Sequence, residues 1–557
     1  MPVITFPQQN LTVTAEQGEL LLSVMRRAGI RVETPCGGMG TCGKCLVRVS
    51  EPDAVRLTGD RKKSAAPDCS TGPVLACKAE LIGDTQVFLC GDNGATLDIL
   101  TDGIRASHVL RPAVTKRLRG NVTEVFYNGN SLGTQSGDTT AAVFGLGVDI
   151  GTTTVVVALV DLTAGEEIAS ASALNPQCAY AQDVVSRIEF ASRGVHELEL
   201  LHGELIGLLN ELIKKLAADA QIDTADIYEA VFSGNTTMLH LAAGIDPYPL
   251  GQYPYTSVLN GDEAIPAQRI GLEVSPLGVV YIPPIISAYI GTDITAGALA
   301  TDIASLAGNT LFIDIGTNGE MIFASDGKLS ATSTAAGPAF EGMNITMGMR
   351  AQTGAIERFE IGETGETSVG TIGGAQAAGI CGSGLFDIVG ELVRIGAIQK
   401  SGKLIKATDA ARIPGFGGLL TAHNGVNAVQ ISENVVLTQL DIRQVQLAKA
   451  AIRAGIHAML RLNSVGEEAV DRVIIAGSFG YHLRAESLIN TGILPPSMRG
   501  KITYAGNTAK SGAIAFLLDT KTRAALHKTA KKIRPLELSD YPDFEKLFIS
   551  HMNFPQL

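Results

Sequence analysis

The sequence predicts a multidomain protein in which a small, cysteine-bearing β domain precedes a larger α/β domain that is internally duplicated. Five of the eight cysteines fall between residues 36 and 77, which indicates a metal site in a compact N-terminal domain. The motif Asp-Ile-Gly-Thr occurs at residues 149–152 and again at 314–317, which indicates two related lobes. The 557 residues are too many for one ordinary hydrophobic core. We expect a domain at residues 1–95, a linker at 96–141 and a duplicated domain at 142–557, with lobes 142–308 and 309–557.

Composition and charge exclude several classes of protein. The net charge of −12 argues against a nucleic-acid-binding surface. No run of eighteen apolar residues is present, so no membrane span is expected. Residues 1–10 lack the charged and apolar regions of a signal peptide, so we predict a cytoplasmic location. In a reducing cytosol, clustered cysteines indicate a metal site more than disulfides.

Residues 1–95 have the element order of a β-grasp ferredoxin. Two short apolar stretches at 3–6 and 11–13 predict a hairpin, and residues 19–29 predict a helix that ends at a glycine. A glycine-rich cysteine loop follows, and then a strand of alternating polarity at 46–49. Hairpin, helix, cysteine loop and strand occur in that order in the small ferredoxins.

The cysteine spacing predicts a [2Fe-2S] cluster held by four thiolates. Three cysteines lie on one glycine-rich loop, where a tightly curled backbone can direct N–H groups at the cluster sulfurs. The fourth follows a distant apolar strand, as in plant-type [2Fe-2S] sites. A zinc site is the alternative, but zinc sites usually use two close cysteine pairs. Cys69 is either a spectator or a competitor of the fourth ligand. The predicted ligands are Cys36, Cys42, Cys45 and Cys77.

Residues 96–141 are irregular and polar, and they include a basic piece at 111–119. We interpret them as a linker with one small hairpin at 122–127 and with little or no middle domain.

The two Asp-Ile-Gly-Thr segments each lie between two apolar strands, and they are candidate phosphate-binding turns. A Gly-Thr turn between strands exposes backbone N–H groups and hydroxyls to an anion. One such turn is a weak signal, because Asp-Gly turns occur in many hairpins. Two copies 165 positions apart are a stronger one. The candidate residues are Gly151, Thr152, Thr153, Thr154, Gly316, Thr317, Asn318 and Gly319.

Three aspartates are candidate catalytic residues. Asp149 and Asp314 end the first strand of each copy, where a carboxylate can hold Mg²⁺ through water or orient an attacking water. Asp293 begins an expected helix and is the third candidate; the alternative is a solvated aspartate at a helix end.

Further glycine turns complete the predicted nucleotide site. Gly382 and Ser383 begin a helix whose N–H groups could accept a phosphate, although a tight helix start alone would explain them. A strand at 472–476 leads into a glycine turn that would let the backbone approach a nucleoside. Residues 233–238 are a further candidate turn or an N-cap, 336–342 are candidates for lining the nucleotide, and His240 is interpreted as structural. The turn after the strand contains Gly477, Ser478 and Gly480.

These motifs carry a resemblance to known proteins. The paired turns resemble the phosphate loops of the acetate kinase, sugar kinase, Hsp70 and actin superfamily, which implies a two-lobed ATPase. With the cysteine motif, the whole chain resembles the reductive activators of corrinoid-dependent methyltransferases. Further matching segments are 175–177, 186–188, 233–238, 314–320, 337–342, 380–384 and 476–480.

The resemblance implies an ATP-dependent reduction. One electron would pass from a [2Fe-2S] cluster to inactive Co(II) cobamide on a partner corrinoid protein and give Co(I). The reduction potential of the Co(II)/Co(I) couple lies below the roughly −400 mV of plant-type ferredoxins, so hydrolysis of ATP, bound with Mg²⁺, would drive the step. The chain has no Asp-x-His-x-x-Gly motif, so the corrinoid is expected on a separate protein. An upstream low-potential electron donor and a homodimer are further expectations.

Three alternatives remain open from the sequence. A small-molecule kinase with a redox-sensing ferredoxin domain would transfer phosphate, and a nucleotide-binding regulator would only change partners. An activator of the 2-hydroxyacyl-CoA dehydratase type would be ATP-driven too, but it would carry a [4Fe-4S] cluster shared between two chains.

Overall fold

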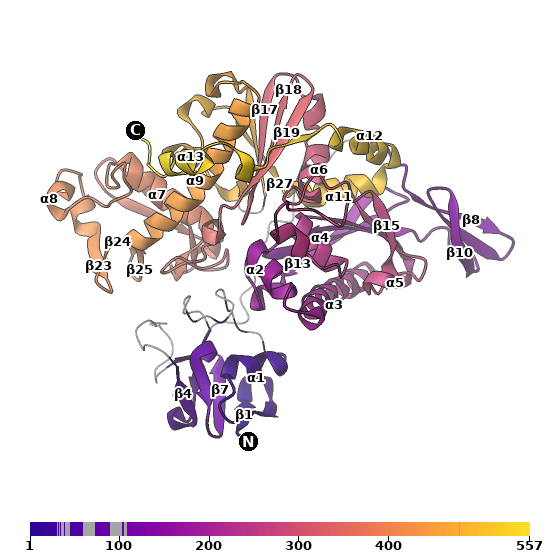
Figure 1. The fold of residues 1–557 in the computed structure, drawn as a ribbon, viewed down its shortest axis with the longest axis horizontal. Coiled ribbons are helices and arrows are strands. Elements are labelled where there is room, and N and C mark those ends of the chain that lie inside the picture. The colour runs from indigo at the N-terminus through magenta and orange to yellow at the C-terminus, as the bar shows by residue number, and fades with distance from the viewer. Residues whose placement is uncertain are drawn as a thin grey trace. The chain divides into compact units, whose positions relative to one another are not determined.

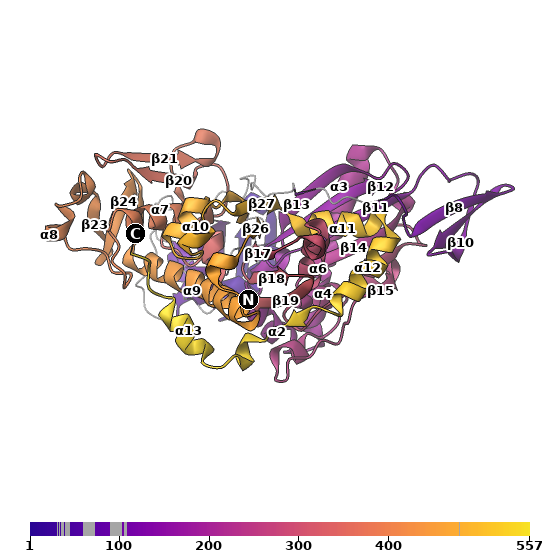
Figure 2. The same cartoon turned by 90° about the horizontal axis from the view of Figure 1, so that it is seen from above.

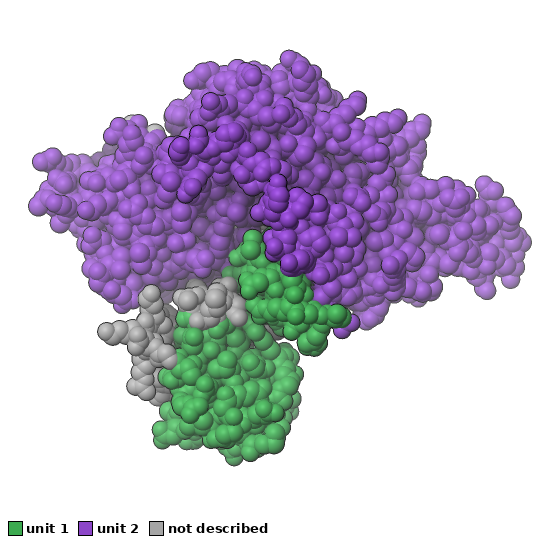
Figure 3. All heavy atoms as spheres, in the orientation of Figure 1, with its two compact units in different colours: residues 1–95, 176–197 green, residues 96–175, 198–557 purple. Residues whose placement is uncertain are grey.

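The computed structural model describes two compact units, which Figure 3 shows in different colours. One unit comprises residues 1–95 and 176–197, and the other comprises 96–175 and 198–557. Three of the predicted site residues discussed below, Cys36, Cys42 and Ser478, lie outside the described residues, as does Cys69. The described residues are 1–30, 32, 34, 38, 40, 45–58, 73–89, 103–104, 109–477 and 480–556.

The first unit contains a five-stranded sheet in the order β2-β1-β7-β3-β5, with helix α1 packed on its core. The predicted hairpin forms as β1 and β2, and β1 pairs in parallel with β7. Helix α1 buries Leu21, Leu22, Val24 and Met25 on one face. The bounds are β1 (Val3–Phe6), β2 (Leu11–Thr14), α1 (Leu21–Arg27), β3 (Leu46–Val49), β4 (Val55–Leu57), β5 (Val74–Leu75), β6 (Ala79–Leu81), β7 (Thr85–Leu89) and α2 (Val184–Ala191).

Part of the predicted linker is more regular than we expected. Strands β8 (Val114–Arg119), β9 (Val122–Tyr127) and β10 (Asn130–Ser136) form a three-stranded antiparallel sheet, where the sequence predicted at most one hairpin. Asn128 and Gly129 connect β9 to β10 with φ of 50° and 81°, the left-handed pair that a tight hairpin requires. This Asn-Gly signal was present in a stretch that we interpreted by its polar composition alone.

The second unit contains two six-stranded sheets with the same core pattern. Their orders are β13-β12-β11-β14-β16-β15 and β27-β26-β17-β18-β19-β28. In each sheet an antiparallel three-strand meander is followed by a strand that pairs in parallel with the meander's first strand, and a further strand pairs in parallel with that one. The bounds are β11 (Phe144–Ile150), β12 (Thr154–Asp161), β13 (Glu166–Leu174), β14 (Ile227–Gly234), β15 (Glu263–Pro266), β16 (Val279–Ile282), β17 (Asn309–Ile315), β18 (Gly319–Ser325), β19 (Lys328–Thr334), β26 (Arg472–Ala476), β27 (Ile502–Gly506) and β28 (Arg534–Pro535).

Helices α6 (Thr292–Ala300) and α11 (Thr508–Leu518) lie between the two sheets (Figures 1 and 2). Their backbones approach closely, because a Cβ on Gly512 would lie 2.2 Å from the carbonyl oxygen of Ala296. Apolar side chains of α6 pack with Phe312 and Ile322 of the second sheet, and those of α11 pack with the first. The two helices therefore pack against each other, and each packs against one of the sheets.

The rest of the second unit surrounds these sheets. The largest core gathers around α7 and α9, and a capping box of Thr438 and Asp441 begins α9. None of the described helices is both long and apolar enough to cross a bilayer. The remaining bounds are α3 (Val195–Ala220), α4 (Thr236–Ala242), α5 (Ala267–Ile270), β20 (Ala355–Ile361), β21 (Thr367–Thr371), β22 (Gly379–Ile380), α7 (Gly382–Arg394), α8 (Ala407–Ala410), β23 (Leu420–His423), β24 (Val426–Ser432), β25 (Val435–Thr438), α9 (Gln439–Leu462), α10 (Ala485–Asn490), α12 (Thr520–Ala530) and α13 (Phe544–Ser550).

A buried ion pair ties α12 to the first sheet, and its loss is expected to destabilise the fold. Arg523 Nη1 lies 2.7 Å from Glu229 Oε1, and the two side chains are 7% and 0% exposed. Glu229→Ala would leave the guanidinium buried without its counter-charge, which costs about 3–5 kcal/mol of the free energy of unfolding. Glu273→Ala is the matched control, because its ion pair with Lys214 is exposed and contributes about 0–1 kcal/mol. Equal losses in the two variants, measured by denaturant unfolding, would contradict this prediction.

Candidate functional site

The two predicted phosphate turns have the same position in the two sheets. The first connects β11 to β12, and the second connects β17 to β18. In each turn the glycine N–H donates across the turn, from Gly151 to Thr154 O and from Gly316 to Asn318 O, both at 2.9 Å. A Cβ on Gly151 would lie 2.6 Å from the Thr154 carbonyl oxygen, so the first turn requires glycine.

The three predicted aspartates lie near the ends of β11 and β17 and at the start of α6. They interact electrostatically with one another, and each is half-buried. Burial raises the pKa of Asp149 to about 6, against the hydrogen bond that its Oδ2 accepts from Asn507 at 2.8 Å. Burial raises the pKa of Asp293 to about 7 and that of Asp314 to about 8, and the neighbouring aspartates contribute to both shifts.

A fourth carboxylate, Glu320, belongs to this group, and sequence reasoning did not select it. It is the second residue of β18, directly after the second turn, and is buried. Burial raises the pKa of Glu320 well above its ordinary value, and repulsion from Asp293 and Asp314 adds to the shift. The charged forms of these four carboxylates therefore repel one another.

Three asparagines hold the first turn in place. Asn175 Nδ2 donates to Gly151 O at 2.9 Å, and Asn235 Nδ2 donates to Thr152 Oγ1 at 3.1 Å. The carboxamide oxygen of Asn235 also accepts from Met238 N, so the segment 233–238 is both an N-cap and a neighbour of the turn. Asn507 holds Asp149, as described above. Sequence reasoning gave no role to Asn175 or Asn507.

The third glycine motif reaches the carboxylates from β26. Gly477 has a φ of +90°, and a Cβ there would lie 2.4 Å from Asp314 Oδ1. Gly480 packs against Ile475 and Ile315. The motif therefore lies beside the second phosphate turn, as a two-lobed nucleotide site requires.

Gly382 and Ser383 are the first two residues of α7, which is not one of the elements that flank the two phosphate turns. A Cβ on Gly382 would lie 1.6 Å from the Phe340 carbonyl oxygen, so the packing of this helix start requires glycine. A phosphate-binding role for these two residues stays a prediction. His240 is buried, and its Nδ1 lies 2.8 Å from Thr236 O, in agreement with the structural role that we predicted.

Two of the four predicted cluster ligands lie together in the first unit. Cys45 Sγ and Cys77 Sγ are 3.3 Å apart, and the residues are 1% and 3% exposed. Two buried thiols at this spacing fit adjacent ligands of one metal centre. Gly38 and Gly40, on the loop between the first two predicted ligands, have φ of +95° and +78°, which a tightly curled cysteine loop needs.

The positive charge of Arg26 is expected to raise the reduction potential of a cluster bound at Cys45 and Cys77. Burial lowers the pKa of this guanidinium, and attraction to Cys45 and Cys77 opposes that shift. Arg26→Gln removes a positive charge near the thiolates, so the midpoint potential should fall by roughly tens of millivolts. Arg27→Gln, on the exposed side of the same helix, is the control and should leave the potential unchanged. An EPR-monitored redox titration measures both, and equal potentials for Arg26→Gln and the parent chain would refute the role.

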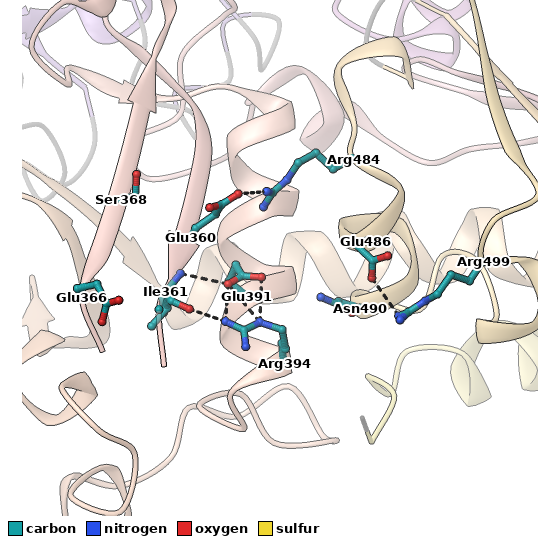
Figure 4. A pocket seen from close by; sticks show the side chains of 11 residues that line it. Glu360, Ile361, Glu366, Ser368, Glu391, Arg394, Arg484, Glu486, Asn490 and Arg499 are labelled. Atoms are coloured by element: carbon teal, nitrogen blue, oxygen red, sulfur yellow. Dashed lines mark hydrogen bonds and ion pairs between the residues drawn. The ribbon is translucent and has the colours of Figure 1, made fainter. Parts of the chain in front are cut away.

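A separate cavity of about 560 Å³ lies among β20, β21, α7 and α10 (Figure 4). Its arginines are paired with glutamates: Arg394 with Glu391 at 2.7 Å and Arg499 with Glu486 at 3.0 Å. Arg484 contacts Glu360 and Asp387. None of the predicted site residues lines this cavity, so we assign it no role.

Comparisons with known proteins agree with this arrangement. Three family descriptions match the chain: "2Fe-2S iron-sulfur cluster binding domain" at residues 4–81, "RACo middle region" at 144–305 and "C-terminal domain of RACo the ASKHA domain" at 308–557. They confirm the predicted fold class, a [2Fe-2S] ferredoxin-like domain followed by an ATPase domain of the actin, Hsp70 and sugar-kinase type. They support a [2Fe-2S] cluster and ATP as ligands of the chain.

Full-length similarity points the same way. A solved structure described as a reductive activator for corrinoid, iron-sulfur protein is 34% identical, with a TM-score of 0.72, and the match covers 100% of this chain and 98% of that one. The corrinoid activation enzyme RamQ of Eubacterium limosum is 29% identical across 99% of each chain. A [Co(II) methylated amine-specific corrinoid protein] reductase of Methanosarcina barkeri is 22% identical over 74% of this chain and 77% of its own.

Proposed function

Because the chain belongs to the family of reductive activators of corrinoid proteins, we propose that it uses ATP to reduce inactive Co(II) cobamide on a partner protein to Co(I). The observation that supports this most is the presence of a thiolate pair and a two-lobed carboxylate site in one chain. When bound, the [2Fe-2S] cluster supplies a one-electron donor. We propose that Cys36, Cys42, Cys45 and Cys77 hold it.

We propose that the two turns and their carboxylates bind Mg²⁺-ATP. In the part of the chain that the structure describes, no three His, Cys, Asp or Glu side chains are close enough to hold a metal ion directly. Mg²⁺ usually keeps several waters and takes one or two carboxylates together with the phosphates. In this proposal Asp149, Asp293 and Asp314 orient the hydrated cation and the attacking water.

The remaining predicted contacts divide between phosphates and nucleoside. Backbone N–H groups of the two turns would contact the phosphates, and Gly477 to Gly480 would lie against the nucleoside. The residues of the first turn are Gly151, Thr152, Thr153 and Thr154, and those of the second are Gly316, Thr317, Asn318 and Gly319. Gly382 and Ser383 would contribute from the start of α7, and Ser478 from the third motif.

ATP is needed because the electron transfer is unfavourable by itself. The cobalt couple of such cobamides lies below the roughly −400 mV of plant-type ferredoxins. Closure of the two lobes on ATP, followed by hydrolysis, provides a change of shape that can alter docking or cobalt ligation. An upstream low-potential donor would restore the electron, and a homodimer is a candidate assembly.

The ATPase rate with and without a Co(II) corrinoid protein tests this proposal. We expect the partner to stimulate hydrolysis and no small-molecule phosphate acceptor to be consumed. A phosphorylated small molecule would favour a kinase instead. Iron counting separates the third alternative: two irons per chain support the proposal, whereas one four-iron cluster bridging two chains would overturn it.

A further inference from the structure

A single carboxylate joins the two phosphate turns. Thr153 of the first turn donates its hydroxyl to Glu341 Oε2 at 2.5 Å, and Thr317 of the second turn donates to Glu341 Oε1. Glu341 is 3% exposed and lies 188 positions from Thr153. Hydrogen bonds from hydroxyls to a carboxylate are about twice as strong as neutral ones. Each lobe therefore presents a hydroxyl to one shared acceptor, which a third segment supplies.

The segment that carries Glu341 is held rigidly. Pro338–Glu341 form one 3₁₀ turn with proline at its start, and Gly342 ends it with a φ of 70°. A Cβ on Gly342 would lie 2.4 Å from the Met349 carbonyl oxygen, so only glycine fits there. The Phe340 ring stacks on Phe386 of α7, with centroids 4.3 Å apart and planes 3° from parallel. The backbone that carries this carboxylate is therefore held by the turn's own proline and glycine and by the packing of Phe340.

The same segment contacts the second turn and the start of α7. Gly337 N donates to Thr317 O at 3.0 Å. Gly382, the first residue of α7, packs against the backbone of Phe340. A displacement of either turn would therefore be transmitted to the other turn and to α7 through the segment that contains Glu341.

We infer that Glu341 is a positioning residue for ATP hydrolysis, which sets the separation of the two phosphate turns by accepting a hydrogen bond from each. The inference rests on the proposed ATP site between these turns. Phosphoryl transfer depends almost entirely on positioning and electrostatic stabilisation, so the separation of the two turns controls the rate of the chemical step. Glu341 acts through Thr153 and Thr317 and needs no contact with the phosphates.

Glu341→Gln tests the shared acceptor in the full chain with its cluster. A carboxamide is neutral and has one acceptor oxygen and one donor nitrogen, so both charge-assisted hydrogen bonds are lost and are replaced at most by weaker neutral ones. We expect kcat for Mg²⁺-ATP hydrolysis to fall by about 10- to 100-fold, with KM changed by less than about threefold. Glu363→Gln, an exposed carboxylate in the turn after β20, is the matched control and should keep the parent rate.

A double-mutant cycle shows whether the two turns are linked through Glu341. Thr153→Val and Thr317→Val each break the same bridge, so their combined loss of kcat should be smaller than the product of the single losses. Glu341 is unchanged in every variant of this cycle, so the cycle tests the inference even if Glu341→Gln does not fold.

The outcomes separate this inference from the function on which it depends. A parent chain that hydrolyses ATP while Glu341→Gln stays within twofold of it would overturn the inference alone. Threonine losses that multiply would also overturn it, and together with a slow Glu341→Gln they would make Glu341 a direct proton acceptor. A parent chain without ATPase activity would overturn both the inference and the proposed site.

Discussion

Asp314→Asn is expected to reduce ATP hydrolysis by about 100-fold or more while the cluster remains spectroscopically unchanged. The substitution keeps the shape of the side chain and removes a charge that the proposed hydrated cation requires. Coupled-enzyme ATPase assays and the visible spectrum measure the two effects. Unchanged turnover would show that another carboxylate, with Glu320 the first choice, has this role.

The same variant is expected to be more stable than the parent at high pH. Burial raises the pKa of Asp314 to about 8. A carboxyl whose folded pKa lies above its unfolded value stabilises the fold at low pH, and this contribution is lost as pH rises from about 4 to 8. Asp314→Asn lacks this loss, so its Tm should exceed the parent's at pH 8 in the absence of nucleotide and Mg²⁺. A Tm of Asp314→Asn below that of the parent chain at pH 8 would contradict the prediction that the charged form of Asp314 destabilises the fold.

Cys77→Ala is expected to remove the cluster and, with it, all reduction of the partner, whereas ATP hydrolysis by the second unit remains. Cys77 Sγ lies 3.3 Å from Cys45 Sγ, so a [2Fe-2S] centre held by both would lose one of its ligands. Iron content and the EPR spectrum of the reduced protein measure the loss. We expect the same result for Cys42→Ser.

Cys69→Ala is the matched control for Cys77→Ala. Both substitutions remove a cysteine from the N-terminal domain, but only Cys77 belongs to the predicted ligand set. Cys69→Ala should therefore retain the iron. If Cys69→Ala lost the iron and Cys77→Ala retained it, Cys69 would be the fourth ligand and Cys77 the spectator.

Much of the fold could be predicted because its signals are local. The repeated Asp-Ile-Gly-Thr segments specify a tight turn between two apolar strands, and the structure places both turns at equivalent positions of two similar sheets. The order of hairpin, helix and cysteine loop likewise predicted the first unit. The three-stranded sheet at 114–136 was missed because its composition is polar, although its Asn-Gly turn was visible.

The contacts within the site that the sequence did not predict join residues far apart along the chain. Thr153 and Glu341 are 188 positions apart, and Asp149 and Asn507 are 358 positions apart. No spacing rule connects such residues, since only the packing of α6 and α11 between the sheets brings the segments together. Glu320 is different, because it directly follows the second turn and was hidden by its place at the start of an apolar strand.

ATP-dependent formation of Co(I) tests the central claim most directly. The protein is reduced anaerobically, separated from excess reductant and mixed with a Co(II) corrinoid protein while the cobalt spectrum is followed. The account predicts that Co(I) appears with Mg²⁺-ATP and fails to appear with a non-hydrolysable analogue, with Cys77→Ala or with Asp314→Asn. Co(I) that forms equally without ATP, or no Co(I) with the corrinoid protein encoded beside this chain, would contradict it.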